Sequence, residues 1–185
     1  MAARIKGINP ACQVETIEEF IDETNVAALI PACDAVIDAI DNVRAKAALI
    51  AYCRQQGIRI LTTGGAGGRL DPTQIQVVDL SRTTQDALAS KVRARLRKQY
   101  GFSRDTKKKF GVECVFSPEQ IRRPAGTLVE GDAVNENRCV TDKVSADLDG
   151  SAGLACAGYG SSVTVTAGFG FAAAAKVLAG ILPTR

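Results

Sequence analysis

The feature that most constrains the fold is an alternation of apolar runs with segments of helical spacing in the first half of the chain. Residues 35–40, AVIDAI, form an almost continuous apolar run, and residues 41–57, DNVRAKAALIAYCRQQG, repeat apolar side chains at helical intervals. Two more strand-like runs follow, IRILTTGG at 58–65 and QIQVVDL at 74–80. Strands that alternate with helices are typical of βαβ units. The pattern therefore predicts an α/β fold around a parallel sheet, in which residues 35–40 form a buried strand.

The other segments fit one domain over residues 1–185, a length that is enough for a single core. Residues 1–8 have the pattern of the end of a helix, which Asn9-Pro10 closes because a residue before proline avoids the α region. In chain order we further expect an edge strand at residues 12–20, a short helix at 25–32 and a basic helix at 85–101. A short strand at 112–116, a polar loop or crossover at 122–153 and an apolar helix at 163–182 would follow.

Composition excludes several classes of chemistry. The chain has no histidine, so it can form neither a Ser-His nor a Cys-His dyad, nor a zinc site that needs imidazole. Its six cysteines never form a C-x-x-C pair, so we expect no zinc site built from thiolates. No signal peptide is readable, which predicts a cytoplasmic protein with reduced thiols.

Charge is distributed unevenly along the chain. Residues 13–42 contain eight acidic side chains and no basic one, whereas residues 82–109 contain ten Lys or Arg against two Asp. A local field of this kind attracts a polyanion, although a solvated helix face is the commoner meaning of such a run. The candidate polyanion contacts are Arg93, Arg95, Arg97, Lys98, Lys107, Lys108 and Lys109.

Two acidic residues stand at the carboxyl end of the predicted strand 35–40. Asp38 and Asp41 lie where the strand gives way to a helix, the edge at which open α/β sheets bind ligands. Carboxylates there could hold hydrated Mg²⁺ with nucleotide phosphates. The alternative is that Asp41, or the neighbouring Asn42, caps the helix.

The segment 61–73, LTTGGAGGRLDPT, places four glycines among five residues directly after a strand. A phosphate-binding loop would lead into a helix N-terminus, but this segment leads into another strand, so we expect no helix N-terminus beside it. We interpret it as a tight turn that brings backbone close to a substrate. The residues of this turn are Thr62, Thr63, Gly64, Gly65, Gly67 and Gly68.

These motifs together resemble a known family. VIDAIDNVRAK at 36–46 is similar to the D-x-x-D-N motif of the ThiF/MoeB/HesA superfamily, whose adenylating enzymes are relatives of the ubiquitin-activating enzymes. With INP at residue 8, TTGGAGGRLDPTQIQVVDL at 62–80 and GVECVFSPE at 111–119, the chain resembles the tRNA threonylcarbamoyladenosine dehydratases. The resemblance covers nearly the whole chain, and the combination is more specific than any single motif.

The resemblance implies a reaction and a set of partners. ATP adenylates the carboxylate of threonylcarbamoyladenosine in tRNA, AMP leaves and the side chain closes into a ring with net loss of water. Asp41 would be catalytic by holding Mg²⁺-ATP, Asn42 would line the adenylate pocket, and Lys46 would offer a cation to phosphate. A homodimer is implied, and a monovalent cation and a sulfur-relay partner are compatible with the family. The basic residues of 82–109 would contact the tRNA backbone.

The resemblance also implies a segment that this sequence does not contain. The family's G-x-G-G-x-G loop, with its ribose-binding acid and its phosphate-binding Arg and Lys, is expected upstream of Met1. We therefore expect a partial Rossmann-like domain of the ThiF/MoeB type that lacks the first βαβ unit and does not adenylate alone. The alternatives are an activator of a ubiquitin-like sulfur carrier and a non-catalytic remnant that binds tRNA or a partner.

Two further features have competing interpretations. Cys114 and Cys156 could take part in sulfur transfer, but buried structural thiols are the commoner case and the one we favour. Residues 163–182 are long and apolar enough to span a bilayer, yet they are rich in Gly and Ala. We favour a helix packed on the sheet over association with a membrane.

Overall fold

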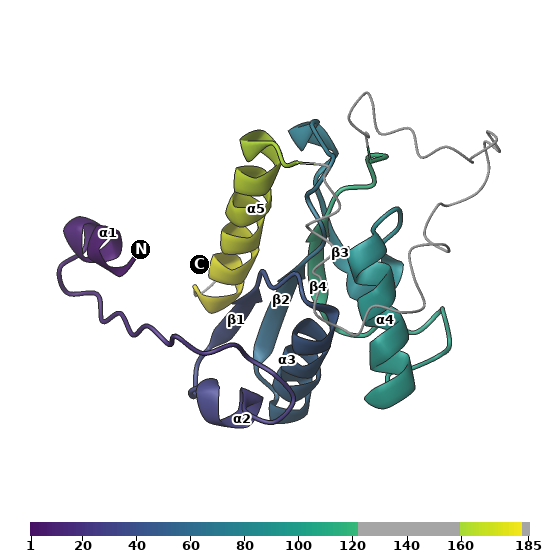
Figure 1. The fold of residues 1–185 in the computed structure, drawn as a ribbon, viewed down its shortest axis with the longest axis horizontal. Coiled ribbons are helices and arrows are strands. Elements are labelled where there is room, and N and C mark those ends of the chain that lie inside the picture. The colour runs from purple at the N-terminus through teal and green to yellow at the C-terminus, as the bar shows by residue number, and fades with distance from the viewer. Residues whose placement is uncertain (122–159, 183–185) are drawn as a thin grey trace.

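The computed structural model describes residues 1–121 and 160–182, in which a four-stranded sheet lies between helices (Figure 1). The strands are β1 (Ala35–Asp38), β2 (Arg59–Thr63), β3 (Gln76–Asp79) and β4 (Glu113–Phe116), in the spatial order β1-β2-β4-β3. β1, β2 and β4 are parallel, and β3 pairs antiparallel with β4. The helices are α1 (Ala2–Ile8), α2 (Val26–Leu29), α3 (Val43–Gln56), α4 (Ala87–Gln99) and α5 (Val163–Ile181), with short 3-10 turns η1 (Pro72–Gln74) and η2 (Leu80–Arg82).

The two faces of the sheet carry separate apolar clusters. Successive side chains of a strand point to opposite faces, so Ile60 and Cys114 join α3 and α4 in one cluster. Leu61 and Val115 face the other way and pack against α5. The sheet is therefore the middle layer, with α3 and α4 on one side and α5 on the other (Figure 1).

The predicted α/β class is confirmed, and the elements expected at 1–8, 25–32, 41–57, 58–65, 85–101, 112–116 and 163–182 are found close to those positions. Asn42 caps α3 by accepting from the backbone N–H groups of Arg44 and Ala45, at 2.9 and 3.1 Å. Gly57 ends the helix in the left-handed conformation, at φ 72°.

Three details of the prediction are wrong. The sheet is mixed rather than parallel, because residues 64–75 hold only η1 and no crossover helix that could return the chain for a parallel β3. Residues 12–20 form no strand, since none of the described strands pairs with them. β1 lies at the edge of the sheet that the described residues form, and its Ile37 is 47% exposed, so it is less buried than its apolar run indicates. The loop or crossover predicted at 122–153 lies outside the described residues.

Candidate functional site

The carboxyl ends of the three parallel strands form the candidate site. The register pairs Asp38 of β1 with Thr62 of β2, and Thr62 with Cys114 of β4, so these strands end side by side. α3 begins directly after β1 at this edge, and the N-cap of α4, Asp86, contacts the glycine turn that follows β2. Helix N-termini carry partial positive charge, which makes the edge favourable for an anion.

Asp38, Lys46 and Thr62 form a buried polar network beneath this edge. The Lys46 ammonium lies 2.8 Å from the Asp38 carboxylate and donates to Thr62 Oγ1 at 2.9 Å. Thr62 Oγ1 in turn donates to the same carboxylate at 2.7 Å, and each of the three residues is only 1% exposed. Lys46 and Asp38 were predicted to contact phosphate or Mg²⁺. In the structure the Lys46 ammonium and the Asp38 carboxylate form an ion pair with each other.

The network fixes the turn that carries Asp41. The other Asp38 carboxylate oxygen accepts from the backbone N–H of Ile40 at 3.0 Å, which holds the chain as it leaves β1. Asp41 follows with an exposed side chain, while the capping role belongs to Asn42. Asp41 is thus an exposed carboxylate at the strand edge, beside the N-terminus of α3.

The glycine turn is held against Asp86. The Asp86 carboxylate accepts from the backbone N–H of Gly65 at 3.0 Å and from that of Ala89 at 2.8 Å, so it joins the turn to the first residues of α4. Gly64 approaches so closely that a Cβ there would be 2.9 Å from Asp86 Cγ. Only a residue without a side chain fits at Gly64 without displacing Asp86.

Arg69 and Glu119 complete the support of the turn. Arg69 is 1% exposed, and its guanidinium lies 3.3 Å from the Asp86 carboxylate and donates to Gln85 O at 2.8 Å. Glu119 Oε2 accepts from the backbone N–H groups of Leu70 and Asp71, both at 2.9 Å. Arg69, Asp86 and Glu119 were not identified as site residues from the sequence. The one signal for them was the position of Arg69 directly after a glycine run, in GGRLD.

A second helix N-terminus reaches the turn from far along the chain. The backbone N–H of Gly68 donates to Gly160 O at 3.0 Å, just before α5 begins after Ser162. A cavity of about 240 Å³ lies here, lined by Gly68, Arg69, Leu70, Gly160, Ser161 and Ser162. We expected no helix N-terminus beside the glycines, and this expectation is wrong. The chain does not enter a helix directly after them, but α4 and α5 both begin next to them in the folded structure. Thr63 and Gly67 are half-buried in the same segment.

The predicted polyanion contacts divide into two groups. Three arginines have partners within the chain: Arg93 donates to Thr83, Arg95 pairs with Glu23 at 2.8 Å, and Arg97 Nε donates to Ser103 O at 3.2 Å. Burial, with a smaller contribution from Arg97, lowers the pKa of Arg93. The four lysines, by contrast, are exposed: Lys98, Lys107, Lys108 and Lys109.

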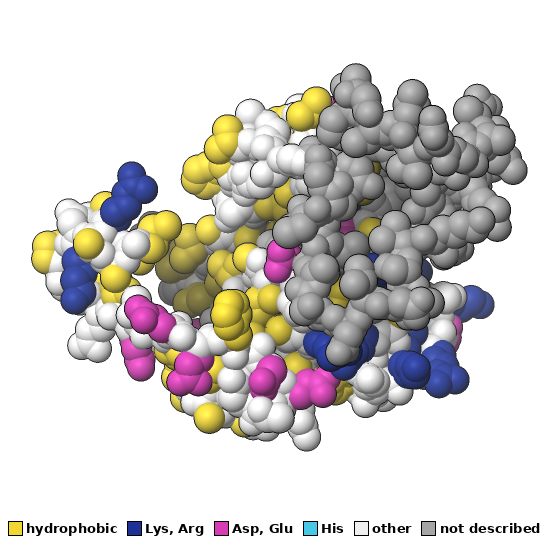
Figure 2. Space-filling model, viewed as in Figure 1, with side chains coloured by type: hydrophobic (Ala, Val, Ile, Leu, Met, Phe, Trp, Pro, Cys, Tyr) yellow, Lys and Arg dark blue, Asp and Glu magenta, His cyan; other side chains and the backbone are white. Residues whose placement is uncertain are grey.

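The surface reproduces the uneven charge of the sequence. In Figure 2 the basic side chains gather over α4 and the loop that follows it, and acidic side chains gather over the segment before β1. The exposed lysines, rather than the arginines of α4, are the groups that could meet a phosphate backbone.

Cys114 lies on β4 with no exposed surface, and burial raises the pKa of its thiol to about 12. A thiol of that pKa stays protonated near neutral pH and is a poor nucleophile. The structure thus favours a structural role for Cys114, and Cys156 lies outside the described residues. In the described part of the chain, no group of three His, Cys, Asp or Glu is placed to hold a metal ion.

α5 packs one stripe of side chains against the sheet. Val165, Phe169, Ala173 and Val177 are buried at intervals of four residues, while Phe171 remains 76% exposed. By length and composition the helix could also cross a membrane, and 22% of its apolar window is buried. The buried stripe agrees with the expectation of packing on the sheet.

Comparison with known proteins defines the class. The ThiF family model matches residues 1–184, and the chain belongs to that family. The tRNA threonylcarbamoyladenosine dehydratase of Escherichia coli (strain K12) is 46% identical over 182 residues, which cover 96% of this chain and 63% of that protein. The protein of the same name from Haemophilus influenzae (strain ATCC 51907 / DSM 11121 / KW20 / Rd) is 45% identical over 187 residues, which cover 100% and 65%.

A solved structure extends the likeness to three dimensions. The crystal structure of the E. coli dehydratase, TcdA, in complex with AMP superimposes with a TM-score of 0.76 at 42% identity. The match covers 97% of this chain and 61% of that one. The chain therefore spans less than two thirds of the length of these relatives and shares the fold of the part it matches.

Proposed function

We propose that this chain acts in the ATP-dependent dehydration of threonylcarbamoyladenosine in tRNA. The carboxylate of the modified nucleoside attacks the α-phosphorus of ATP and releases pyrophosphate. An atom of the same side chain then attacks the activated carbonyl, AMP leaves and a ring closes, so water is lost overall. The observation that carries the proposal is the match, over nearly the whole chain, to relatives named for this reaction, one of them solved with AMP.

The strand edge fits the nucleotide that the proposal requires. Asp41 is the exposed carboxylate there, and one carboxylate with water ligands is a usual way for proteins to hold Mg²⁺-bound phosphates. ATP supplies the leaving group that makes the substrate carboxylate electrophilic. The side-chain oxygen of Asn42 caps α3. Asn42 therefore contributes to the site by fixing the N-terminus of this helix beside the nucleotide.

In this proposal Lys46 and Asp38 position the site instead of touching phosphate. Their buried ion pair, with Thr62, holds the end of β1 against the end of β2 and so sets where Asp41 projects. The glycine turn presents backbone at the same edge, where Gly64 lies so close to Asp86 that a side chain would not fit. Neither role requires a side chain that exchanges protons.

The chemistry needs no nucleophile from this chain. Ring closure joins two parts of one nucleoside, and an intramolecular attack in the right geometry can lower a barrier by about 7–11 kcal/mol. A chain without histidine, whose Cys114 thiol stays protonated, is compatible with that route. The burial of Cys114 and the raised pKa of its thiol do not support the alternative in which this residue carries sulfur for a sulfur-carrier protein.

The remaining partners are part of the same proposal. tRNA is the substrate, and the exposed lysines of α4 and of the loop after it are the groups that we expect to meet its backbone. A homodimer, Mg²⁺, a monovalent cation, a sulfur-relay partner and a cytoplasmic location follow from the resemblance to the family. The packing of α5 on the sheet favours that location over a membrane.

Deleting the gene that encodes this chain tests the proposal. Mass spectrometry of tRNA nucleosides should show that the ring-closed nucleoside disappears and that threonylcarbamoyladenosine, heavier by one water, takes its place. Loss of sulfur-containing nucleosides with an unchanged ring-closed form would instead indicate an activator of a sulfur carrier. No change in either would indicate a non-catalytic remnant.

A further inference from the structure

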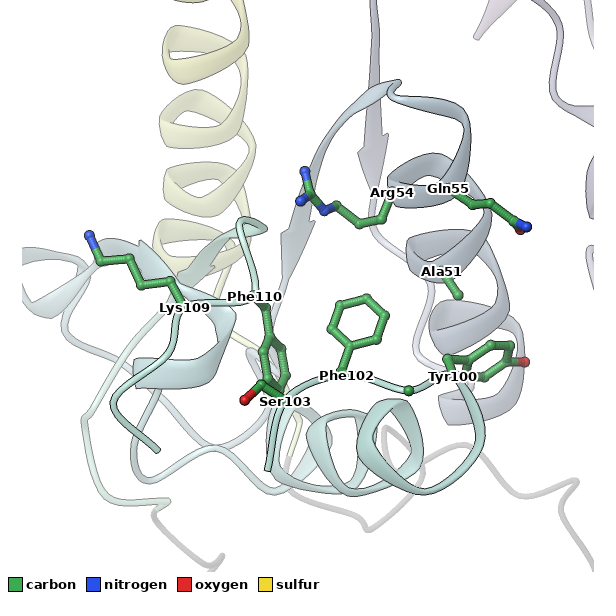
Figure 3. A pocket seen from close by; sticks show the side chains of 9 residues that line it. Ala51, Arg54, Gln55, Tyr100, Phe102, Ser103, Lys109 and Phe110 are labelled. Atoms are coloured by element: carbon green, nitrogen blue, oxygen red, sulfur yellow. The ribbon is translucent and has the colours of Figure 1, made fainter. Parts of the chain in front are cut away.

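A second cavity lies at the end of the molecule opposite the strand edge. It has a volume of about 530 Å³, within the roughly 300–1,000 Å³ typical of ligand sites. The last turns of α3 and α4 and the loop after α4 enclose it (Figure 3). α3 has 14 residues, which at about 1.5 Å each separate this cavity from Asp41 by about 21 Å.

Aromatic side chains line the inner wall of the cavity. Figure 3 shows the Phe102 ring in the middle of it, between Ala51 of α3 and Phe110. The rings of Phe102 and Phe110 meet edge to face, with centroids 5.0 Å apart. Phe110 is buried, whereas Phe102 and Tyr100 are only half-buried and keep part of their rings open to the cavity.

Cations stand at the rim. Arg54 comes from the last turn of α3 and Lys109 from the loop, and both side chains are exposed; in Figure 3 the Lys109 side chain extends outward from the cavity. Among the described residues neither side chain has a hydrogen bond or an ion pair. Lys107, Lys108 and Arg104 are exposed on the same loop, so the rim continues into the basic surface seen in Figure 2.

We infer that this cavity holds an unpaired nucleotide of an RNA chain, with its base stacked on Phe102 and its phosphates at Arg54 and Lys109. Open aromatic rings surrounded by cations are the combination that binds single-stranded nucleic acid, because every base offers a π face and every linkage a charge. The inference rests on the proposed tRNA substrate. It adds a contact about 21 Å from Asp41, at the other end of α3.

The arrangement distinguishes a nucleotide from other occupants. The cavity lies at the C-terminal ends of α3 and α4, where the helix dipoles disfavour an anion inside it. The neutral base therefore belongs inside and the phosphate at the rim, beside the two cations. A purely apolar ligand would leave Arg54 and Lys109 without a role.

Tryptophan fluorescence tests the stacking directly, because the chain contains no tryptophan. In F102W the only indole lies in the cavity, and in the control F171W it lies on the exposed side of α5, across the sheet. Titration with an unmodified tRNA transcript should quench F102W and leave F171W nearly unchanged. Equal quenching of both variants, or of neither while tRNA binds, would overturn the inference.

Filter binding of the same transcript provides a second measurement. F102L keeps an apolar side chain but removes the π face, so it should weaken binding about tenfold. R54Q and K109Q should each reduce the slope of log affinity against log salt by about 0.7, the value for one contact with single-stranded nucleic acid. K6Q, which removes an exposed charge on α1, is the matched control and should leave the slope unchanged.

The two proposals fail separately. The unmodified transcript lacks the group that the dehydratase would act on, so its binding does not depend on catalysis. If the chain binds no tRNA, or binds it equally well in F102L, the cavity is not an RNA site. Nucleoside analysis of the deletion strain then still decides whether the dehydratase proposal stands.

Discussion

Lys46 matches a functional motif and also belongs to the buried polar network beneath the strand edge. Its ammonium is buried with Asp38 and Thr62, and removing one member of a buried ion pair leaves the other charge uncompensated. We expect K46M to lower the free energy of unfolding by about 3–5 kcal/mol in urea denaturation.

K91M removes an exposed lysine of α4 and serves as the control for K46M. It should stay within about 0.5 kcal/mol of the parent chain. Equal stability of the two variants would show that the buried pair does not support the strand edge.

The buried thiols make stability depend on pH. Burial raises the pKa of Cys53 to about 11 and that of Cys114 to about 12, from 9.0. Above pH 9.0 the unfolded chain loses these protons first, so the folded state binds more protons and stability falls as pH rises.

Urea denaturation at a series of alkaline pH values should show this fall, and C53A/C114A should show a smaller one. The double variant will be less stable at every pH because it leaves cavities, so the slope is the informative quantity. An identical slope in both chains would mean that the thiols titrate normally.

At the scale of elements, the glycine turn and α4 are built as one unit. A methyl group at Gly64 would collide with the Asp86 carboxylate, which caps α4 and pairs with Arg69. G64A should therefore destabilise the chain by about 1–3 kcal/mol.

G65A is a close control, because the nearest atom to a Cβ at Gly65 is Leu88 Cβ at an ordinary 3.9 Å. Thermal unfolding of the two variants should separate them clearly. If G65A costs as much as G64A, the turn is sensitive to any side chain and the contact with Asp86 is not the reason.

An element could be predicted from sequence when the signals that define it lie within its own residues. α3 was predictable because its cap, its apolar spacing and Gly57 are local signals. The direction of β3 was not, since it depends on the absence of a crossover helix and on pairing with β4, which comes later in the chain. The exposed edge of β1 likewise depends on its neighbours and not on its own apolar run.

At the scale of the whole molecule, the motif residues were visible in sequence but their supports were not. Asp41 and the glycines could be predicted to share an edge because parallel strands end together. Arg69, Asp86 and Glu119 come from three segments that only the fold unites, as does the N-terminus of α5 beside Gly68. The cavity around Phe102 is likewise formed by the ends of two helices that are distant in sequence.

We propose that Asp41, at the strand edge, carries the nucleotide chemistry. The direct test is to complement a deletion strain with the complete gene that encodes this chain, carrying D41N or, as the control, D34N, and to measure the ring-closed nucleoside in tRNA by mass spectrometry. Asp34 is an exposed aspartate just before β1, at the opposite end of that strand. We predict that D34N restores the ring-closed form and D41N does not; full restoration by D41N would contradict the account.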